Sequence, residues 1–181
     1  MAHVKAATLI YLRTKTRAMG GDAEKQLLAG LTPADVKLYN TALSTSWIPM
    51  DLAARLYPVG AAILFPGDPR CLQRLGAAVA KDNFTTVYKV LLRLATIPFP
   101  ISQTAKVWRT YHQQGVLRVE HGDGTKEASL HLAEYPDLLP PVADCMTGYI
   151  VGLSELSGAR NTSADVESLG GGKFRWTVRW E

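Results

Sequence analysis

The sequence has few of the residues from which disulfide frameworks and metal sites are built. Its 181 residues include only two cysteines, Cys71 and Cys145. Two thiols cannot form a structural zinc site alone and make a poor disulfide framework, which favours a reducing compartment. The four histidines include no pair at the i, i+4 spacing of a helical metal site. We therefore expect no metal and no cofactor, and we expect both thiols to act as small apolar side chains.

Long apolar segments are also missing. No run approaches the roughly 18 residues of a membrane span, and the N-terminus has no apolar segment followed by a small-residue cleavage site. With 47% hydrophobic and 20% charged residues, the chain can bury a full core in one domain covering 1–181. These features predict a cytoplasmic protein that has no membrane span and is not exported.

The sequence contains no recognisable catalytic set. Residues 152–155 (Gly-Leu-Ser-Glu) resemble a nucleophile elbow, but no glycine stands two residues after the serine and no strand precedes it. The glycines at 170–172 lack the downstream context of a phosphate-binding loop. No two carboxylates are placed for acid–base work in an identifiable cleft. We expect a protein that is not an enzyme.

Acidic residues are absent from the first 21 positions. Lys5, Arg13, Lys15 and Arg17 lie there, and they equal the whole net charge of +4, because the other 16 basic residues balance the 16 acidic ones. A basic helix face can dock on an acidic protein, a lipid surface or nucleic acid, although a solvated helix face is the simpler interpretation. We expect no nucleic-acid binding, because such proteins usually show a broader basic footprint with a recognisable motif.

The clearest pattern that is present lies in residues 115–181. Apolar residues recur every three or four positions over 141–158, which predicts a helix with one buried stripe: Val142, Cys145, Met146, Tyr149, Ile150, Leu153 and Leu156. Segment 174–180 alternates aromatic or apolar residues with polar ones, as a strand with one buried face does. Two hairpins flank the helix. The sequence thus predicts an α+β fold, with helices in 1–114 and a ββαββ unit of four antiparallel strands in 115–181.

The first hairpin can be aligned on its turn. A two-residue turn at 123–124 sets Leu117 opposite Leu130 and Val119 opposite Ala128, which places apolar residues together on one face.

The second hairpin turns at 170–172. This turn sets Val166 opposite Trp176 and Glu167 opposite Arg175, an apolar pair on one face and a charge pair on the other.

Proline, glycine and capping residues divide the front of the chain into short helices. Thr32, Pro33 and Asp35 form the strongest start signal, with a capping hydroxyl, a proline at the first helical position and an acid in the first turn. A break follows at 44–47. The expected helices cover 4–19, 22–31, 32–43, a segment starting at 49, 69–81, a segment starting at 83, and 102–115.

Several segments together resemble a known superfamily. They are the helices followed by hairpin, helix and hairpin, the Cys-x-x-Gly step at 145–148 and the aromatic-x-Val-x-Trp pattern of the final strand. This superfamily contains the haem-nitric oxide/oxygen binding (H-NOX) sensors, the 4-vinyl reductase-type domains and the TRAPP vesicle-tethering subunits. Within it, the chain is most similar to an uncharacterised group found in myxobacteria and related deltaproteobacteria, through Val-Lys-Ala-Ala at 4–7, Trp-Ile-Pro at 47–49, Phe-Pro-Gly at 65–67 and Trp-Thr-Val-Arg-Trp at 176–180. The resemblance covers nearly the whole chain and implies a fold rather than a reaction.

The resemblance implies a way to test for haem. H-NOX proteins hold iron with a histidine on a helix before the sheet and bind the haem propionates with a Tyr-x-Ser-x-Arg motif. The matching segment, 130–136, has neither the serine nor the arginine, and Glu134 carries the wrong charge for a propionate. His112 is the candidate axial ligand, but a solvated histidine at a helix C-terminus is the simpler interpretation. From the sequence we expect no haem.

Two functional hypotheses remain. The first is a non-catalytic regulatory or scaffold module that acts through protein contacts, as a homodimer that uses its front helices, with Lys5, Arg13, Lys15 and Arg17 as candidate partner-binding residues. The alternative is a sensor that binds an apolar or aromatic small molecule between helix 141–158 and the front helices. Its candidate pocket residues are Trp47, Trp108, Tyr111, Cys145 and Tyr149. These side chains could equally be ordinary core residues. Gly148 and Gly152, one turn apart, would let a helix or a ligand approach the backbone closely.

Overall fold

The computed structural model describes residues 2–83, 108–122 and 124–181, and it has an α+β fold, as predicted. The front half contains β1 (His3–Lys5), α1 (Ala7–Met19), α2 (Ala23–Leu28), α3 (Pro33–Thr41), β2 (Trp47–Pro49), α4 (Met50–Leu64) and α5 (Cys71–Asn83). The second half contains β3 (Val116–His121), β4 (Glu127–Ala133), α8 (Pro140–Leu156), β5 (Ser163–Gly170) and β6 (Lys173–Arg179).

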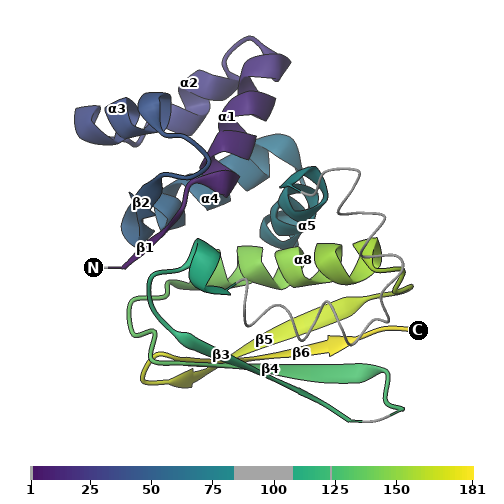
Figure 1. The fold of residues 1–181 in the computed structure, drawn as a ribbon. Helices are drawn as coiled ribbons and strands as arrows, with labels where there is room; N and C mark the ends of the chain where they lie inside the picture. Colours follow the sequence, from purple (N-terminus) through teal and green to yellow (C-terminus); the bar gives the residue numbers. More distant parts are fainter. Residues whose placement is uncertain (1, 84–107, 123) are drawn as a thin grey trace.

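The second half is built on a four-stranded antiparallel sheet in the order β3-β4-β6-β5. Helix α8 lies across one face of the sheet, and α5 lies on the far side of α8 (Figure 1). Trp176 projects from β6 towards α8 and is fully buried. Its indole Nε1 donates to Thr147 Oγ1 on α8 at 3.0 Å, so the largest side chain of the core has its polar atom satisfied.

Helices α5 and α8 pack backbone against backbone because three glycines remove the side chains between them. A Cβ built on Gly76 would lie 1.8 Å from the carbonyl oxygen of Cys145, and one on Gly148 would lie 1.8 Å from that of Gln73. Gly152 has the same role against Ala77, at 2.8 Å. The predicted close approach at Gly148 and Gly152 is confirmed, and the approaching element is α5. Helix α8 is therefore buried on two sides, by the sheet and by α5.

The two hairpins differ in how well their strand pairing could be predicted. The second is confirmed, with Val166 opposite Trp176 and Glu167 opposite Arg175.

The predicted pairing of the first hairpin is wrong by two residues: Leu117 lies opposite Leu132 and Val119 opposite Leu130. The connection is longer than a two-residue turn, because Thr125 Oγ1 donates to the carbonyls of Gly122 and Glu127 and organises a wider loop. Since the shift is an even number of residues, the same side chains still face the core.

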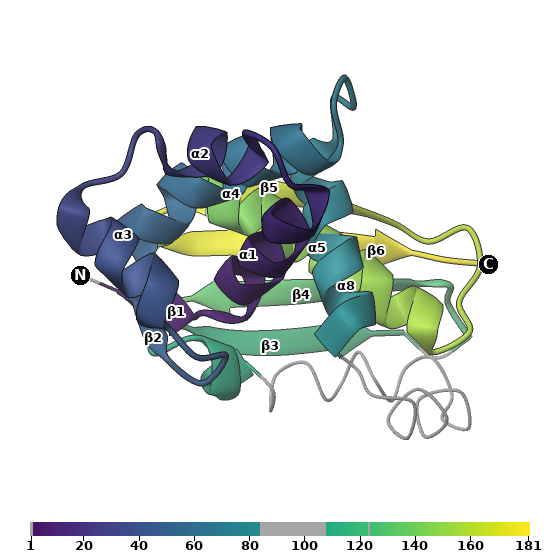
Figure 2. The same cartoon turned by 90° about the horizontal axis from the view of Figure 1, so that it is seen from above.

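The other helices of the front half, α1 to α4, lie on the same side of the sheet as α5 and α8, as the view from above in Figure 2 shows. The start signal of α3 is confirmed as a capping box between Thr32 and Asp35. Helix α1 begins at Ala7, later than expected, because His3–Lys5 pairs with Trp47–Pro49 as a two-stranded ribbon. The sequence predicts no strand here, and the expected break at 44–47 and the expected helix start at 49 overlap the two ends of β2. The helix expected from residue 83 lies almost wholly outside the described residues, as does most of the one expected over 102–115, whose residues 108–111 are helical.

None of the helices in the described ranges is both long enough and apolar enough to span a membrane.

The glycine contact gives a direct test of the packing between α5 and α8. Gly148→Ala should destabilise the protein by about 2–3 kcal/mol, because the new methyl group would overlap the Gln73 carbonyl and force the helices apart. The measurement is urea unfolding followed by circular dichroism. The control is Gly30→Ala, at a position where a Cβ meets nothing within 4 Å, and it should leave the unfolding midpoint nearly unchanged. Equal midpoints for the two variants would contradict the packing described here.

Candidate functional site

A cavity of about 100 Å³ lies where the two halves of the fold meet. Its described wall comes from the sheet, from α8 and from α5. The remainder comes from the start of the chain, from Tyr57 of α4 and from Trp108, Tyr111 and His112. The sheet contributes Leu117, Leu130 and Trp176, and α8 contributes Val142, Cys145, Met146, Tyr149, Ile150 and Leu153. Almost all of this lining is apolar or aromatic, as in typical small-molecule sites.

The cavity brings together most of the predicted pocket residues. Trp108, Tyr111, Cys145 and Tyr149 all line it, and the rings of Tyr111 and Tyr149 lie 6.2 Å apart. Trp47 does not line it. Trp47 is part of the ribbon in the front half, where the Lys5 ammonium lies 3.8 Å from the centre of its ring.

His112 also lines the cavity, and its predicted position in solvent is wrong. Its ring is stacked on Trp108 with 4.0 Å between centroids and 9° between planes. Its Nδ1 lies 3.3 Å from the hydroxyl oxygen of Tyr135. Burial lowers the pKa of His112 to about 3, so the imidazole is neutral at physiological pH. The i, i+4 spacing of Trp108 and His112 is the sequence signal that could have indicated this stacking.

Tyr135, the partner of His112, was missed because it follows the end of β4 in an irregular segment. It is fully buried. Its backbone N–H donates to the carbonyl of Gly172 at 3.1 Å, in the turn between β5 and β6. A Cβ on Gly172 would lie 2.5 Å from the nitrogen of Pro136, so this turn packs directly on the segment. The chain also bends sharply here, since Glu134 has a φ of 61°. The hairpin turn thus holds Tyr135 in place against His112.

The two cysteines are not arranged for chemistry. Burial raises the pKa of the Cys145 thiol to about 12, so the thiol stays protonated and unreactive. Cys71 is partly buried at the start of α5, and neither cysteine is in a disulfide. Within the described ranges, no group of three or more histidine, cysteine or acidic side chains could hold a metal ion.

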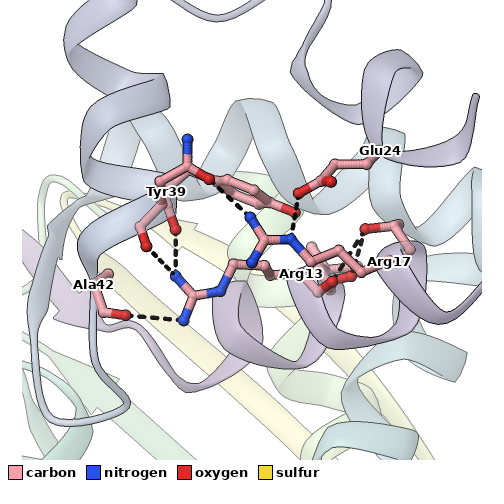
Figure 3. A network of polar contacts seen from close by, with 8 residues as sticks. Arg13, Arg17, Glu24, Tyr39 and Ala42 are labelled. Carbon is pink, nitrogen blue, oxygen red and sulfur yellow. Dashed lines mark hydrogen bonds and ion pairs between the residues drawn. The ribbon is translucent and has the colours of Figure 1, made fainter.

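The basic residues at the start of the chain are engaged within the molecule, as Figure 3 shows for two of them. The Arg13 guanidinium donates to the carbonyls of Tyr39, Asn40 and Ala42 at 2.5, 3.1 and 3.1 Å, and so satisfies the C-terminal end of α3. Arg17 donates to Glu24 at 2.7 Å and to Asn40 Oδ1 at 2.8 Å.

The two lysines have partners too. Lys15 lies 3.9 Å from Asp82 of α5, and Lys5 donates to the carbonyl of Thr45 at 2.8 Å. All four predicted partner-binding residues thus make contacts inside the protein, and the two arginines join α1 to α2 and α3.

The neutral state of His112 predicts how stability depends on pH. Its pKa is lower in the folded than in the unfolded protein, so its unfolded form takes up a proton first as the pH falls. The contribution is complete above about pH 6.5 and is lost between there and about pH 3, with a slope of at most about 1.4 kcal/mol per pH unit. Urea unfolding between pH 7.5 and 4 should therefore show a smaller loss of stability in His112→Gln than in the wild type. His121→Gln, which replaces a partly buried histidine at the end of β3, is the control. Parallel pH profiles for the wild type and His112→Gln would contradict the buried neutral imidazole.

No family model matches the sequence. No curated protein matches it either.

Solved structures do match, over the whole chain. An H-NOX protein from S. oneidensis in the Fe(II)NO ligation state has a TM-score of 0.66 at 10% identity, covering 97% of this chain and 98% of that chain. An unliganded Fe(II) H-NOX mutant from K. algicida has a TM-score of 0.64 at 12% identity, with 98% and 96% covered. A point mutant of T. tengcongensis H-NOX has a TM-score of 0.63 at 12% identity, with 98% and 97% covered. The chain therefore has an H-NOX-like fold.

Proposed function

We propose that the protein is a small-molecule sensor that binds an apolar or aromatic ligand in the cavity between α8, the sheet and the front half. The observation that carries the proposal is the cavity itself, which is apolar, is lined by aromatic side chains and has walls from both halves of the fold. Interiors are normally packed without such spaces, and an engineered apolar cavity of about 150 Å³ binds benzene or xenon.

The interpretation as a scaffold acting only through protein contacts is overturned. It depended on the missing catalytic residues, on the basic first helix and on the fold. The full-length matches are to H-NOX proteins, among them one solved with Fe(II)NO, and these support a ligand-sensing role instead. The basic residues also give the scaffold no support, since Arg13 and Arg17 are used to hold α1 against α2 and α3.

The expectation that the protein binds no haem is overturned by the same matches to H-NOX proteins. One structural neighbour comes from work on heme distortion in the H-NOX family. In this chain His112 supplies a neutral imidazole at the cavity wall, and a partner on its Nδ1 is the usual arrangement for a metal-ligating histidine. His112 would hold the iron, and haem would supply a centre that binds diatomic molecules. The cavity, at about 100 Å³, is smaller than the engineered cavity of about 150 Å³ that binds benzene, so a porphyrin requires the surrounding side chains to move. Haem is therefore one of the ligands to test.

Residues that line the cavity are connected to the front helices, so a bound ligand can affect those helices. Val4 and Thr8, at the start of the chain, line it. Val4 also bridges to His112, and the N–H of Gln113 donates to the carbonyl of His3 at 3.5 Å. The same strand, β1, pairs with β2 at the start of α4. A ligand that moves the wall near His112 thus acts on a strand shared with the helical layer.

Finer features belong to the same proposal and remain predictions. They are a cytoplasmic protein without catalytic activity, homodimerisation, and kinship with the 4-vinyl reductase-type domains, the TRAPP subunits and the myxobacterial group.

Native mass spectrometry of freshly purified protein tests the sensor proposal, followed by titration with haemin and with benzene. We expect a co-purifying small mass or saturable binding of at least one probe, with a raised melting temperature. Val142→Phe should abolish binding, because it places a ring in the cavity wall, whereas Leu169→Phe at an exposed position should not. A clean apo mass with no binding of either probe would overturn the proposal. A Soret band after reconstitution, lost in His112→Ala, would identify haem as the ligand.

A further inference from the structure

The Tyr149 side chain gives the cavity a chemical preference, an inference that rests on the proposed function. Tyr149 lies on α8 and lines the cavity. We infer that the ligand is a small neutral aromatic or apolar molecule with one hydrogen-bonding group, which pairs with the Tyr149 hydroxyl.

The Tyr149 hydroxyl oxygen is buried and has no hydrogen-bond partner among the residues that the structure describes. Asn83 and Tyr111 lie beside it and influence its pKa, and neither forms a hydrogen bond to it in the structure. Buried hydroxyls are nearly always paired, because an unpaired one loses its hydrogen bonds to water without compensation. Burial also raises the pKa of Tyr149, so the group stays a neutral hydroxyl that can both donate and accept. A ligand can supply the partner that these residues do not.

The rest of the wall favours a neutral ligand. Lys5 is the one charged residue among the described residues that line the cavity. Its ammonium already donates to the Thr45 carbonyl and lies over the Trp47 ring. The thiol of Cys145 and the imidazole of His112 are both uncharged at neutral pH. A charged ligand would lose its hydration without gaining a free counter-charge, whereas an aromatic ring can pack against Tyr111, Trp108 and Trp176.

Tyr39 provides a matched control. Its hydroxyl is also buried and unpartnered within the described part of the chain, but it belongs to α3 in the front half and does not line the cavity. Tyr39→Phe and Tyr149→Phe each remove one unpaired buried hydroxyl. Both should raise the melting temperature of the ligand-free protein by roughly 2–4 °C, because an unsatisfied group is lost. Only Tyr149→Phe should change which ligand the protein binds.

The test measures the affinities of phenol and benzene for the wild type and for both variants by calorimetry or by ligand-detected NMR. The two probes differ by one hydroxyl. We expect Tyr149→Phe to weaken phenol binding about tenfold while benzene binding changes less than about twofold. Tyr39→Phe should leave both affinities unchanged.

The outcomes separate this inference from the sensor proposal. If Tyr149→Phe binds phenol as tightly as the wild type does, or loses both probes equally, the assigned hydrogen bond is wrong while the cavity remains a binding site. If neither probe binds the wild type, the assigned hydrogen bond is wrong, and so is the proposal that this cavity binds an organic ligand.

Discussion

The contact between α5 and α8 is the constraint on which the rest of the structure depends. Gly76 and Gly148 place the backbone of each helix against that of the other, at a separation that no side chain allows. Because α5 comes this close, Val79 of α5 and Cys145, Tyr149 and Ile150 of α8 line one cavity. Helices α4 and α1 pack on α5, and α4 also packs on α8, so this contact helps to join the front half to the layer that covers the sheet. Larger residues at these glycines would separate the layers and open the cavity to solvent.

The interior and the surface use polar groups differently. Inside, the polar atoms between α8 and the sheet include a neutral hydrogen-bonded pair, Trp176 Nε1 and Thr147 Oγ1. The outer face of the sheet carries the charges, in pairs such as Arg175 with Glu167 and Arg179 with both Glu127 and Asp165. Such exposed pairs contribute little, about 0–1 kcal/mol each, so stability comes mainly from the layers around α8. The hydroxyls of Tyr39 and Tyr149 are both buried and unpaired within the described ranges, and of the two only Tyr149 lines the apolar cavity, where a ligand would supply the missing partner.

Much of this architecture could be predicted from residue periodicity, and the failures have physical causes. The stripe of α8 and the alternation of β6 are long patterns, and they gave the fold class and the second hairpin. In the first hairpin, alternation fixed the face but not the pairing, because strands shifted by two residues bury the same side chains. The ribbon of β1 and β2 was missed because strands of three residues carry no period. Four cavity residues could be named from the sequence, since large amphipathic side chains are rare. His112 and Tyr135 could not be, because their contact joins residues 23 apart through a hairpin turn that only the folded chain brings near.

The central claim is that the space beside α8 is a binding site rather than a packing defect closed in solution. Xenon binds dry apolar cavities without hydrogen bonds, so it reports the space independently of ligand identity. A crystal pressurised with xenon and measured by anomalous diffraction is the most direct test. If the space is a binding site, a xenon peak should appear between α8 and the sheet, in contact with Val142, Ile150 and Trp176. A map without a peak at that position, with these side chains packed against one another, would contradict it.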